Sequence, residues 1–195
     1  MAQKMLNPSH RNLIVIDVET SGINPFLHEV IAIGLVPLDD ELPKLTVYIR
    51  HEKIEWTEYA HQNFNKFACE WNYQAVPPQV ACIEIENYLC RTFDGQLATA
   101  IGHNVGFDLS FLKRLAFQGA RDQIKGLSHR AIDTHTLLYL LNLDRKIPET
   151  AITSDGALEF FSVDVEESAR HTALGDAEAT SKLFKRILEK IDSDH

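Results

Sequence analysis

The sequence predicts an α/β fold in which a mixed β-sheet is covered by helices on both faces. Up to about residue 50 the apolar segments have the character of β-strands, and beyond residue 76 the apolar period lengthens to between three and four, as in helices. Short apolar strands alternate with the helical segments in this second part. Three strands followed by alternating helices and strands predict both antiparallel and parallel neighbours in one sheet.

Three consecutive strands are expected near the start of the chain. Residues 13–19 carry apolar side chains on both faces, so this strand should be central in the sheet. Residues 29–38 and 44–50 form the next two strands, and the polar segment DDELP between them is typical of a hairpin. We therefore expect these three strands to be antiparallel neighbours.

The later elements are indicated by their periodicity and by signals at their ends. A helix should begin after Pro77 and Pro78 and end at Gly95, because apolar residues recur at helical spacing between them. The other expected elements are strands at 97–102 and 130–133, and helices at 107–118, 134–142, 155–162 and 173–191.

Composition and charge narrow the class of protein. The 195 residues are 45% hydrophobic and 24% charged, which suits one compact domain with its own core. No linker divides the chain, so residues 12–192 are expected to form a single domain after a flexible tail at 1–11. The formal net charge of −9 argues against a broad basic surface that coats nucleic acid, but not against a protein that grips a chain end through bound cations.

The cysteines and the apolar segments indicate the compartment. Cys69, Cys82 and Cys90 show neither a C-x-x-C pair nor the spacing of zinc ligands. The N-terminus lacks the apolar stretch of a signal peptide, and no run approaches the roughly 18 apolar residues of a membrane span. These features predict a cytoplasmic protein without a membrane partner.

Two carboxylates, Asp17 and Glu19, stand one residue apart at the end of the first strand, in the segment LIVIDVETSG. Residues 17 and 19 project from the same face of a strand, so their carboxylates should converge where that face leaves the core. Such groups resist ionising together unless a cation lies between them. Taken alone, the pair is equally compatible with two solvated side chains at a strand end.

A second group of polar residues follows the strand expected at 97–102. The segment GHNVGFDLSFL places His103, Asn104 and Asp108 where a strand passes into a helix, and side chains at such a position commonly reach a ligand at the sheet edge. Taken alone, Asp108 is more simply explained by the start of the helix, where a carboxylate interacts favourably with the helix dipole.

A third group precedes the last helix, in the segment RHTALGDAEAT. Five residues turn an α-helix through about 500°, so His171 and Asp176 would not share a face if both were helical. The spacing instead favours His171 on a loop, Thr172 as the N-cap and Asp176 in the first turns. Taken alone, a histidine before a helix is more often a surface residue than a catalyst.

The three groups are more specific together than separately. Four carboxylates would meet at one end of the sheet, with His171 on a loop beside them; they are Asp17, Glu19, Asp108 and Asp176. Hard oxygen ligands without thiolates favour Mg²⁺ or Mn²⁺ over zinc. Carboxylate sites that hold two such cations about 3.5–4 Å apart serve in-line displacement at phosphate. The sequence therefore predicts a two-cation site that acts on a phosphate ester.

The motifs DVETSG, HNVGFD and HTALGD, in this order and separation, resemble the three exonuclease motifs of the DEDDh group of the DnaQ-like 3′→5′ exonucleases. That group includes RNase T and the epsilon subunit of bacterial DNA polymerase III, and the resemblance covers roughly residues 13–188. The segment IDTHTL also resembles the Asp-Thr that follows the last strand of the family. The resemblance implies a ribonuclease H-like fold, with a mixed five-stranded sheet and helices on both faces.

The resemblance also implies a role for individual residues. It assigns the metal-binding and catalytic carboxylates to Asp17, Glu19, Asp108 and Asp176, the general base to His171, the main contacts with the terminal nucleotide to Thr20 and Ile23, and secondary contacts to Asn104 and Phe107. It implies two divalent cations, Mg²⁺ or Mn²⁺, as cofactors. The implied reaction releases 5′-mononucleotides from the 3′ ends of single-stranded DNA or RNA.

Residues 51–78 depart from the family pattern and are rich in aromatic side chains, namely Trp56, Tyr59, Phe64, Phe67, Trp71 and Tyr73. One interpretation is a platform on which nucleic-acid bases stack. The favoured interpretation is a small helical subdomain that uses the aromatic side chains as its core. We therefore treat residues 51–78 as a variable insertion within the domain.

Two other functions fit the same fold. One is a noncatalytic domain that binds nucleic acid or a polymerase, although four converging carboxylates give a binding module no advantage. The other is a nuclease that cuts internally, which the loop histidine and the motif spacing disfavour. The residues do not decide between DNA and RNA, and they leave open both a homodimer and a polymerase partner.

Overall fold

The computed structural model describes residues 12–193, so the expected tail at 1–11 lies outside the described residues. At its centre is a five-stranded sheet with the strand order β3-β2-β1-β4-β5. The strands are β1 (Leu13–Thr20), β2 (Val30–Pro37), β3 (Leu45–Tyr48), β4 (Ala98–Gly102) and β5 (Leu127–Asp133). β2 is antiparallel to both β1 and β3, whereas β4 is parallel to both β1 and β5. The predicted mixed sheet with a central first strand is confirmed.

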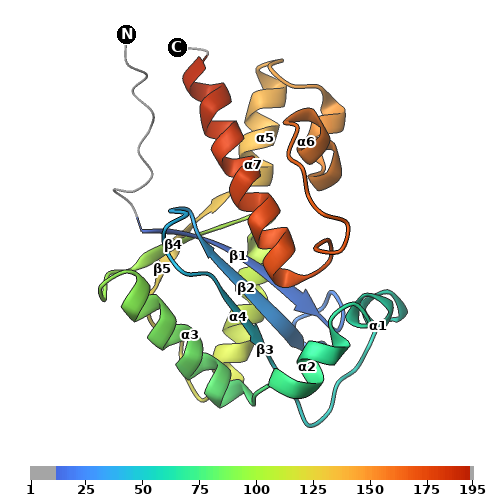
Figure 1. Cartoon of the computed structure of the whole chain (residues 1–195), viewed down its shortest axis with the longest axis vertical. Helices are drawn as coiled ribbons and strands as arrows, with labels where there is room; N and C mark the ends of the chain where they lie inside the picture. Colours follow the sequence, from blue (N-terminus) through green and yellow to red (C-terminus); the bar gives the residue numbers. More distant parts are fainter. Residues whose placement is uncertain (1–11, 194–195) are drawn as a thin grey trace.

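Helices cover both faces of the sheet. α7 (Ala173–Ser193) crosses one face over β1 and β2, and α5 (Thr134–Leu143), the 3₁₀-helix η2 (Glu149–Ile152) and α6 (Ser154–Phe160) lie on its side of the molecule (Figure 1). α3 (Pro78–Thr92) and α4 (Gly106–Gln118) cover the opposite face. The six elements expected beyond residue 96 and the helix after Pro77 are all present, whereas η2 was not predicted.

Side chains along β1 alternate between the two faces of the sheet. Ile14 and Ile16 pack with side chains of α3 and α4, whereas Leu13 and Val15 pack with side chains of α7. All four are buried because β1 is the middle strand. Since alternate residues of a strand share a face, the odd-numbered residues that follow are directed toward α7.

β1 extends further than its neighbour β4. The paired residues of the two strands end at Val15 and Ile101, and β4 itself ends at Gly102. Within the described residues, the last part of β1 up to Thr20 therefore has no strand partner on the β4 side. This free edge, at the carboxyl ends of parallel strands, is where ligands commonly bind in open α/β sheets.

Residues 51–78 contain two short helices, α1 (Glu58–Phe64) and α2 (Ala68–Gln74). Their aromatic side chains pack on one another and on β3: the ring centroids of Phe64 and Phe67 are 5.4 Å apart, and those of Phe64 and Trp71 are also 5.4 Å apart. Trp71 Nε1 donates a hydrogen bond of 2.9 Å to the carbonyl oxygen of Ile49. The favoured interpretation of a small aromatic core is confirmed, and only Tyr59 and Tyr73 of the six aromatic side chains are exposed.

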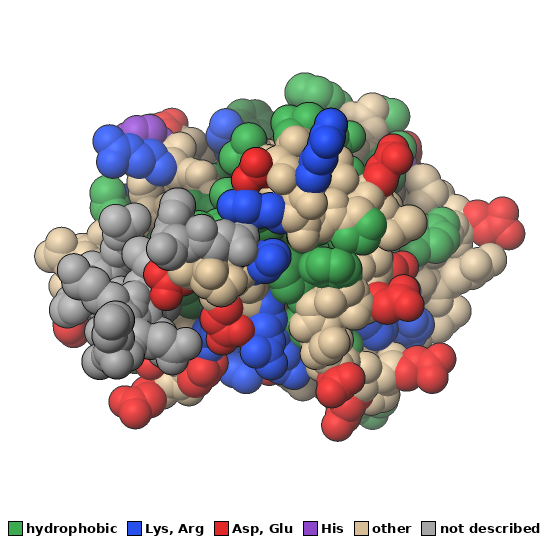
Figure 2. Space-filling view, turned by 90° about the horizontal axis from the view of Figure 1, so that it is seen from above, with side chains coloured by type: hydrophobic (Ala, Val, Ile, Leu, Met, Phe, Trp, Pro, Cys, Tyr) green, Lys and Arg blue, Asp and Glu red, His purple; other side chains and the backbone are tan. Residues whose placement is uncertain are grey.

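The surface shows no dominant charge on the face seen from the top of Figure 1. There, Asp and Glu side chains are intermixed with Lys and Arg side chains (Figure 2). Cys82 is buried, Cys69 and Cys90 are exposed, and all three are free thiols. Among residues 12–193, every helix is too short or too polar to cross a lipid bilayer.

Candidate metal centre

Three of the acidic residues predicted from the sequence meet at the free end of β1. Asp17 and Glu19 belong to β1, and Asp176 belongs to the first turn of α7. One carboxylate oxygen of each residue lies within 4.8 Å of the other two, and all three residues are half-buried. The expected convergence of these side chains is present, because α7 crosses the face toward which the odd-numbered residues of β1 project.

The start of α7 is built as the sequence predicts. The Gly175 N–H donates a hydrogen bond of 3.2 Å to Thr172 Oγ1, so Thr172 acts as the N-cap. The first helical residue, Ala173, is buried beside Phe67 of the aromatic segment and Ala32 of β2. The aromatic segment thus supports the helix turn that carries Asp176.

Asp108 approaches the centre differently from the other three carboxylates. It lies in the first turn of α4, is only 5% exposed, and its Oδ1 accepts a hydrogen bond of 3.0 Å from the Val18 N–H. This N–H belongs to the part of β1 that β4 does not pair, so Asp108 satisfies a backbone donor at the free edge. Asp108 is therefore a neighbour of the cluster and not one of the three residues whose oxygens converge.

Burial raises the pKa of all four carboxyl groups, and repulsion within the cluster adds to this effect for Asp17 and Glu19. Burial raises the pKa of Asp17 well above its ordinary value, and the charges of Asp108, Glu19 and Asp176 raise it further. Burial, with the charge of Asp176, raises the pKa of Glu19 to about 7. Burial likewise raises the pKa of Asp108 to about 7 and raises that of Asp176. Without a cation, the cluster therefore retains protons that isolated carboxylic acids would lose.

The donor atoms of the cluster suit a hard divalent cation. Its three converging ligands are carboxylate oxygens, which Mg²⁺ and Mn²⁺ prefer. Asp176 Oδ1 is buried and, among the described residues, accepts no hydrogen bond. Arg170 Nη1 lies 3.3 Å from this oxygen as an ion-pair partner, and a bound cation would supply the direct contact that a buried acceptor without a hydrogen bond lacks. The residues therefore fit the metal that the sequence implies.

His171 lies on the loop immediately before α7, as predicted. Its backbone has a φ of 58°, and its N–H donates a hydrogen bond of 3.1 Å to Asp176 Oδ2. The residue is half-buried beside the cluster. This hydrogen bond holds the loop against the Asp176 side chain through the backbone of His171, and the imidazole takes no part in it.

The end of β1 and the loop that follows it carry the two residues predicted to make the main contacts with a nucleotide. Thr20 Oγ1 donates a hydrogen bond of 2.8 Å to the Gly22 carbonyl oxygen, and Ile23 is 81% exposed. Two hydrogen bonds between Ser21 and Glu29 join the ends of this loop. The Ser21 N–H donates to the Glu29 carbonyl oxygen at 2.8 Å, and the Glu29 N–H donates to Ser21 Oγ at 2.9 Å. The loop is thus a short, hydrogen-bonded segment that presents an apolar side chain to solvent.

The second motif places its two predicted contact residues in different environments. Asn104 is exposed, has a φ of 62°, and its N–H donates a hydrogen bond of 2.8 Å to Asp133 Oδ1. Phe107 is half-buried and packs on Phe111, with ring centroids 4.9 Å apart. Asn104 is therefore accessible to a ligand, whereas Phe107 is only partly accessible because one side of its ring packs on the core.

Two basic residues beside the cluster were not predicted, namely Lys66 and Arg170. Lys66 lowers the pKa of Glu19 against the effect of burial, and Arg170 does the same for Asp17. Arg170 directly precedes His171 of the third motif, so its place in the sequence could have indicated that it lies near the carboxylates. Lys66 comes from the aromatic segment, and only the packing of that segment against α7 brings it to the site.

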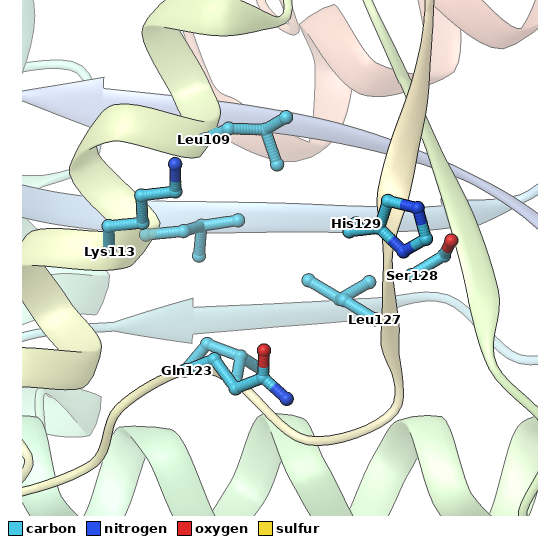
Figure 3. Close-up of a pocket in the computed structure, with 8 residues that line it drawn as sticks. Leu109, Lys113, Gln123, Leu127, Ser128 and His129 are labelled. Atoms are coloured by element: carbon cyan, nitrogen blue, oxygen red, sulfur yellow. The ribbon is translucent and has the colours of Figure 1, made fainter.

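A cavity of about 190 Å³ lies between α4 and β5 (Figure 3). Its walls are formed by Leu109, Leu112, Lys113, Gln123, Ile124, Leu127, Ser128 and His129. None of the site residues predicted from the sequence is among these described wall residues. The cavity is therefore separate from the acidic cluster.

Comparisons with known proteins agree with the geometry. The RNase T exonuclease family model matches residues 14–184. Ribonuclease T of Shewanella denitrificans is 26% identical over 188 residues, which are 91% of this chain and 80% of that protein.

Solved structures share the fold at low sequence identity. The nuclease domain of 3′hExo, described as a DEDDh family member bound to rAMP, has a TM-score of 0.72 and 16% identity, covering 93% of this chain and 94% of that one. Exonuclease I of E. coli in complex with a dT13 oligonucleotide has a TM-score of 0.71 and 15% identity, covering 89% of this chain. The chain spans only 40% of the length of that exonuclease I.

Proposed function

Because the chain belongs to the exonuclease family of RNase T, as a DEDDh-type 3′→5′ exonuclease, we propose that it shortens single-stranded DNA or RNA from the 3′ end. Each cycle would release one 5′-mononucleotide. The observation that carries this proposal is the cluster of Asp17, Glu19 and Asp176, whose oxygens lie within 4.8 Å of one another beside the His171 loop.

The four acidic residues would hold two divalent cations, Mg²⁺ or Mn²⁺. Asp17, Glu19 and Asp176 would bind one of them, and Asp17 with Asp108 would bind the other, with Asp108 in an outer position because one of its oxygens serves the Val18 N–H. When bound, such cations neutralise the charge of the phosphodiester and lower the pKa of a coordinated water.

His171 would act as the general base. A neutral imidazole has one ring nitrogen that accepts a proton, so a ring nitrogen of His171 can take the proton of the attacking water. The water oxygen forms a new bond to phosphorus, in line with the bond between phosphorus and the 3′ oxygen. That bond breaks, and the 3′ oxygen leaves with the shortened strand. The phosphate remains on the 5′ carbon of the released nucleotide, so the product is a 5′-mononucleotide.

The terminal nucleotide would lie against the loop that follows β1. Thr20 and Ile23 are one and four residues beyond Glu19, and Ile23 presents its side chain to solvent. Asn104 and Phe107 would add secondary contacts from the second motif. An accessible apolar side chain beside a metal centre suits the face of a nucleobase.

The proposal includes the setting of the enzyme. We assign residues 12–192 to one exonuclease domain, with residues 51–78 as an insertion that supports the start of α7. The exposed free thiols of Cys69 and Cys90 suit a reducing compartment, so we assign the enzyme to the cytoplasm.

A time course on single-stranded DNA and RNA oligomers labelled at either the 3′ or the 5′ end tests this function. With Mn²⁺ or Mg²⁺, we expect a one-nucleotide ladder that shortens from the 3′ end and disappears in EDTA. A circular strand should resist cleavage, and its degradation would indicate an internal nuclease instead. Absence of cleavage with every metal would favour the noncatalytic binding domain.

A further inference from the structure

Arg170 links the acidic cluster to a second carboxylate on α6. Its Nη2 lies 2.5 Å from Asp155 Oδ1, and its Nη1 lies 3.3 Å from Asp176 Oδ1. The side chain is 21% exposed, and Lys66 Nζ donates a hydrogen bond of 3.3 Å to the Arg170 carbonyl oxygen. The guanidinium therefore has one edge held by Asp155 and the other edge directed at a member of the cluster.

We propose that Arg170 binds the phosphate that the enzyme cleaves, by donating a hydrogen bond from Nη1 to a non-bridging oxygen of the terminal phosphodiester. This inference rests on the proposed hydrolysis of a 3′-terminal phosphodiester. It assigns a substrate contact to a residue outside the four carboxylates and His171.

Geometry places Arg170 within reach of such a phosphate. Two adjacent oxygens bound to the same Mg²⁺ ion in octahedral arrangement lie about 3 Å apart, because each is roughly 2.0–2.1 Å from the ion. Arg170 Nη1 is already 3.3 Å from Asp176 Oδ1, an oxygen of the candidate cation site. A phosphate oxygen that shared a cation with Asp176 Oδ1 would lie on the same side of the cluster as Nη1, and a side-chain movement of Arg170 would bring the two into hydrogen-bonding contact.

The charge balance of the site also favours one positively charged side chain in addition to the two metal ions. Four ionised carboxylates neutralise two divalent cations, which leaves the negative charge of the phosphodiester without a partner. Arginine remains protonated throughout the usable pH range, and its planar fork matches the geometry of phosphate oxygens. Arg170 and Lys66 are both basic residues beside the cluster, and of the two Arg170 has its guanidinium 3.3 Å from a cluster oxygen, so it is placed to supply this positive charge.

The ion pair with Asp155 orients Arg170 more than it stabilises the fold. The Asp155 side chain is 85% exposed, and exposed ion pairs contribute little to the free energy of folding. Without such a tether, a long side chain would lose more conformational entropy when it binds a phosphate. Asp155 is therefore a positioning residue for Arg170.

Two equilibrium measurements separate phosphate binding from a purely structural role. The first is the affinity for Mn²⁺ alone, from the electron paramagnetic resonance signal of the free ion. The second is the affinity for AMP at saturating Mn²⁺, with adenosine as the ligand that lacks the phosphate. Both are measured on the wild type, Arg170→Ala, Arg170→Lys and Asp155→Asn, with Arg186→Ala as the control for loss of a surface cation on α7.

In Arg170→Ala, we expect the affinity for AMP to fall roughly 10- to 100-fold, the usual effect of losing a hydrogen bond to a charged group. The affinity for Mn²⁺ should stay the same or rise, because a competing cation has been removed, and adenosine binding should not change. Arg170→Lys should lose less than Arg170→Ala, and Asp155→Asn should lose less still. Cleavage by Arg170→Ala should fall by a similar factor at an unchanged melting temperature.

Unchanged AMP affinity in Arg170→Ala would overturn the inference. So would a parallel loss of Mn²⁺, AMP and adenosine affinity in Arg170→Ala and Asp155→Asn, because that pattern indicates a tether of the His171 loop. Failure of the proposed function is distinguishable from both, since the wild type would then show no metal-dependent cleavage at all.

Discussion

The backbone of Gly34 in β2 lies so close to the backbone of Ala173 in α7 that a Cβ atom at Gly34 would overlap the Ala173 carbonyl oxygen. Gly34 is also the residue of β2 that pairs with Asp17. The absence of a side chain at this position lets the first turn of α7 approach the sheet beside Asp17. This close approach brings Asp176 to the two carboxylates of β1.

Gly34→Ala should therefore displace the start of α7 and separate Asp176 from Asp17. We expect a loss of about 1–3 kcal/mol in the free energy of unfolding, as for other overpacked positions. Activity should fall roughly 100-fold, because small displacements of catalytic groups have large effects. Urea unfolding and initial cleavage rates measure the two effects. Gly106→Ala is the stability control, since a Cβ there meets no atom within 4 Å, and equal destabilisation of both variants would contradict the explanation.

Asp17→Asn and Asp176→Asn should each abolish metal-dependent cleavage while the fold remains intact. An amide has nearly the shape of a carboxylate but lacks the charge that binds a divalent cation. Cleavage of a labelled oligomer, with circular dichroism as the measure of folding, tests both variants. Asp122→Asn changes an exposed carboxylate outside the centre and should behave as wild type. Full activity in both site variants would refute the assignment of the metal ligands.

The metal-free protein should lose stability as the pH rises through 7. Carboxylic acids in an unfolded chain ionise near pH 4, whereas the folded pKa values of Glu19 and Asp108 are raised to about 7. Between these values the folded state binds more protons, so the stabilisation is complete below pH 4 and is lost as the pH passes 7. Burial lowers the pKa values of His51 and His103, so these two residues make the stability increase with pH. This increase is complete near pH 6.5, the ordinary pKa of histidine, and does not offset the decline above it.

The measurement is the free energy of unfolding in EDTA between pH 6.5 and 8. Saturating Mn²⁺ should remove the decline, because the cation stabilises the ionised carboxylates. Asp17→Asn should reduce the decline without metal, because it removes a carboxyl group whose own pKa is raised well above its ordinary value by burial. A metal-free stability that rises over this range would show that the cluster does not retain its protons.

His171→Ala should lower the rate of cleavage by roughly 10²–10⁴-fold, the usual contribution of a general base. Binding of Mn²⁺ should persist, because Asp176 accepts its hydrogen bond from the His171 backbone and not from the imidazole. Rates under single-turnover conditions and Mn²⁺ titrations test the two statements. His129→Ala, on β5 and away from the cluster, is the matched control. A loss of metal binding equal to the loss of rate would indicate a structural role for His171.

Most secondary structure was predictable because its signals lie between residues close in the chain. The apolar segments of β1 and β2 and the periodic residues of α3 and α7 depend on local spacing alone. η2 was not predicted, since a helix of four residues contains too few turns to show a period, and α1 and α2 were expected only as parts of a small helical subdomain without bounds. The aromatic residues of this region were predicted to form a core, but their support of Ala173 depends on a contact between distant segments.

The sequence by itself determined the chemical inventory of the site: four carboxylates and His171, in three motifs whose spacing places them at strand ends and at a helix start. Only the tertiary structure decided how they divide. Three converge, whereas Asp108 uses one oxygen for the Val18 N–H at the unpaired edge of β1. The close approach at Gly34 and the placement of Arg170 are likewise tertiary. Residue types and spacing are local properties of the chain, but distances between carboxylates depend on how separate elements pack across the sheet.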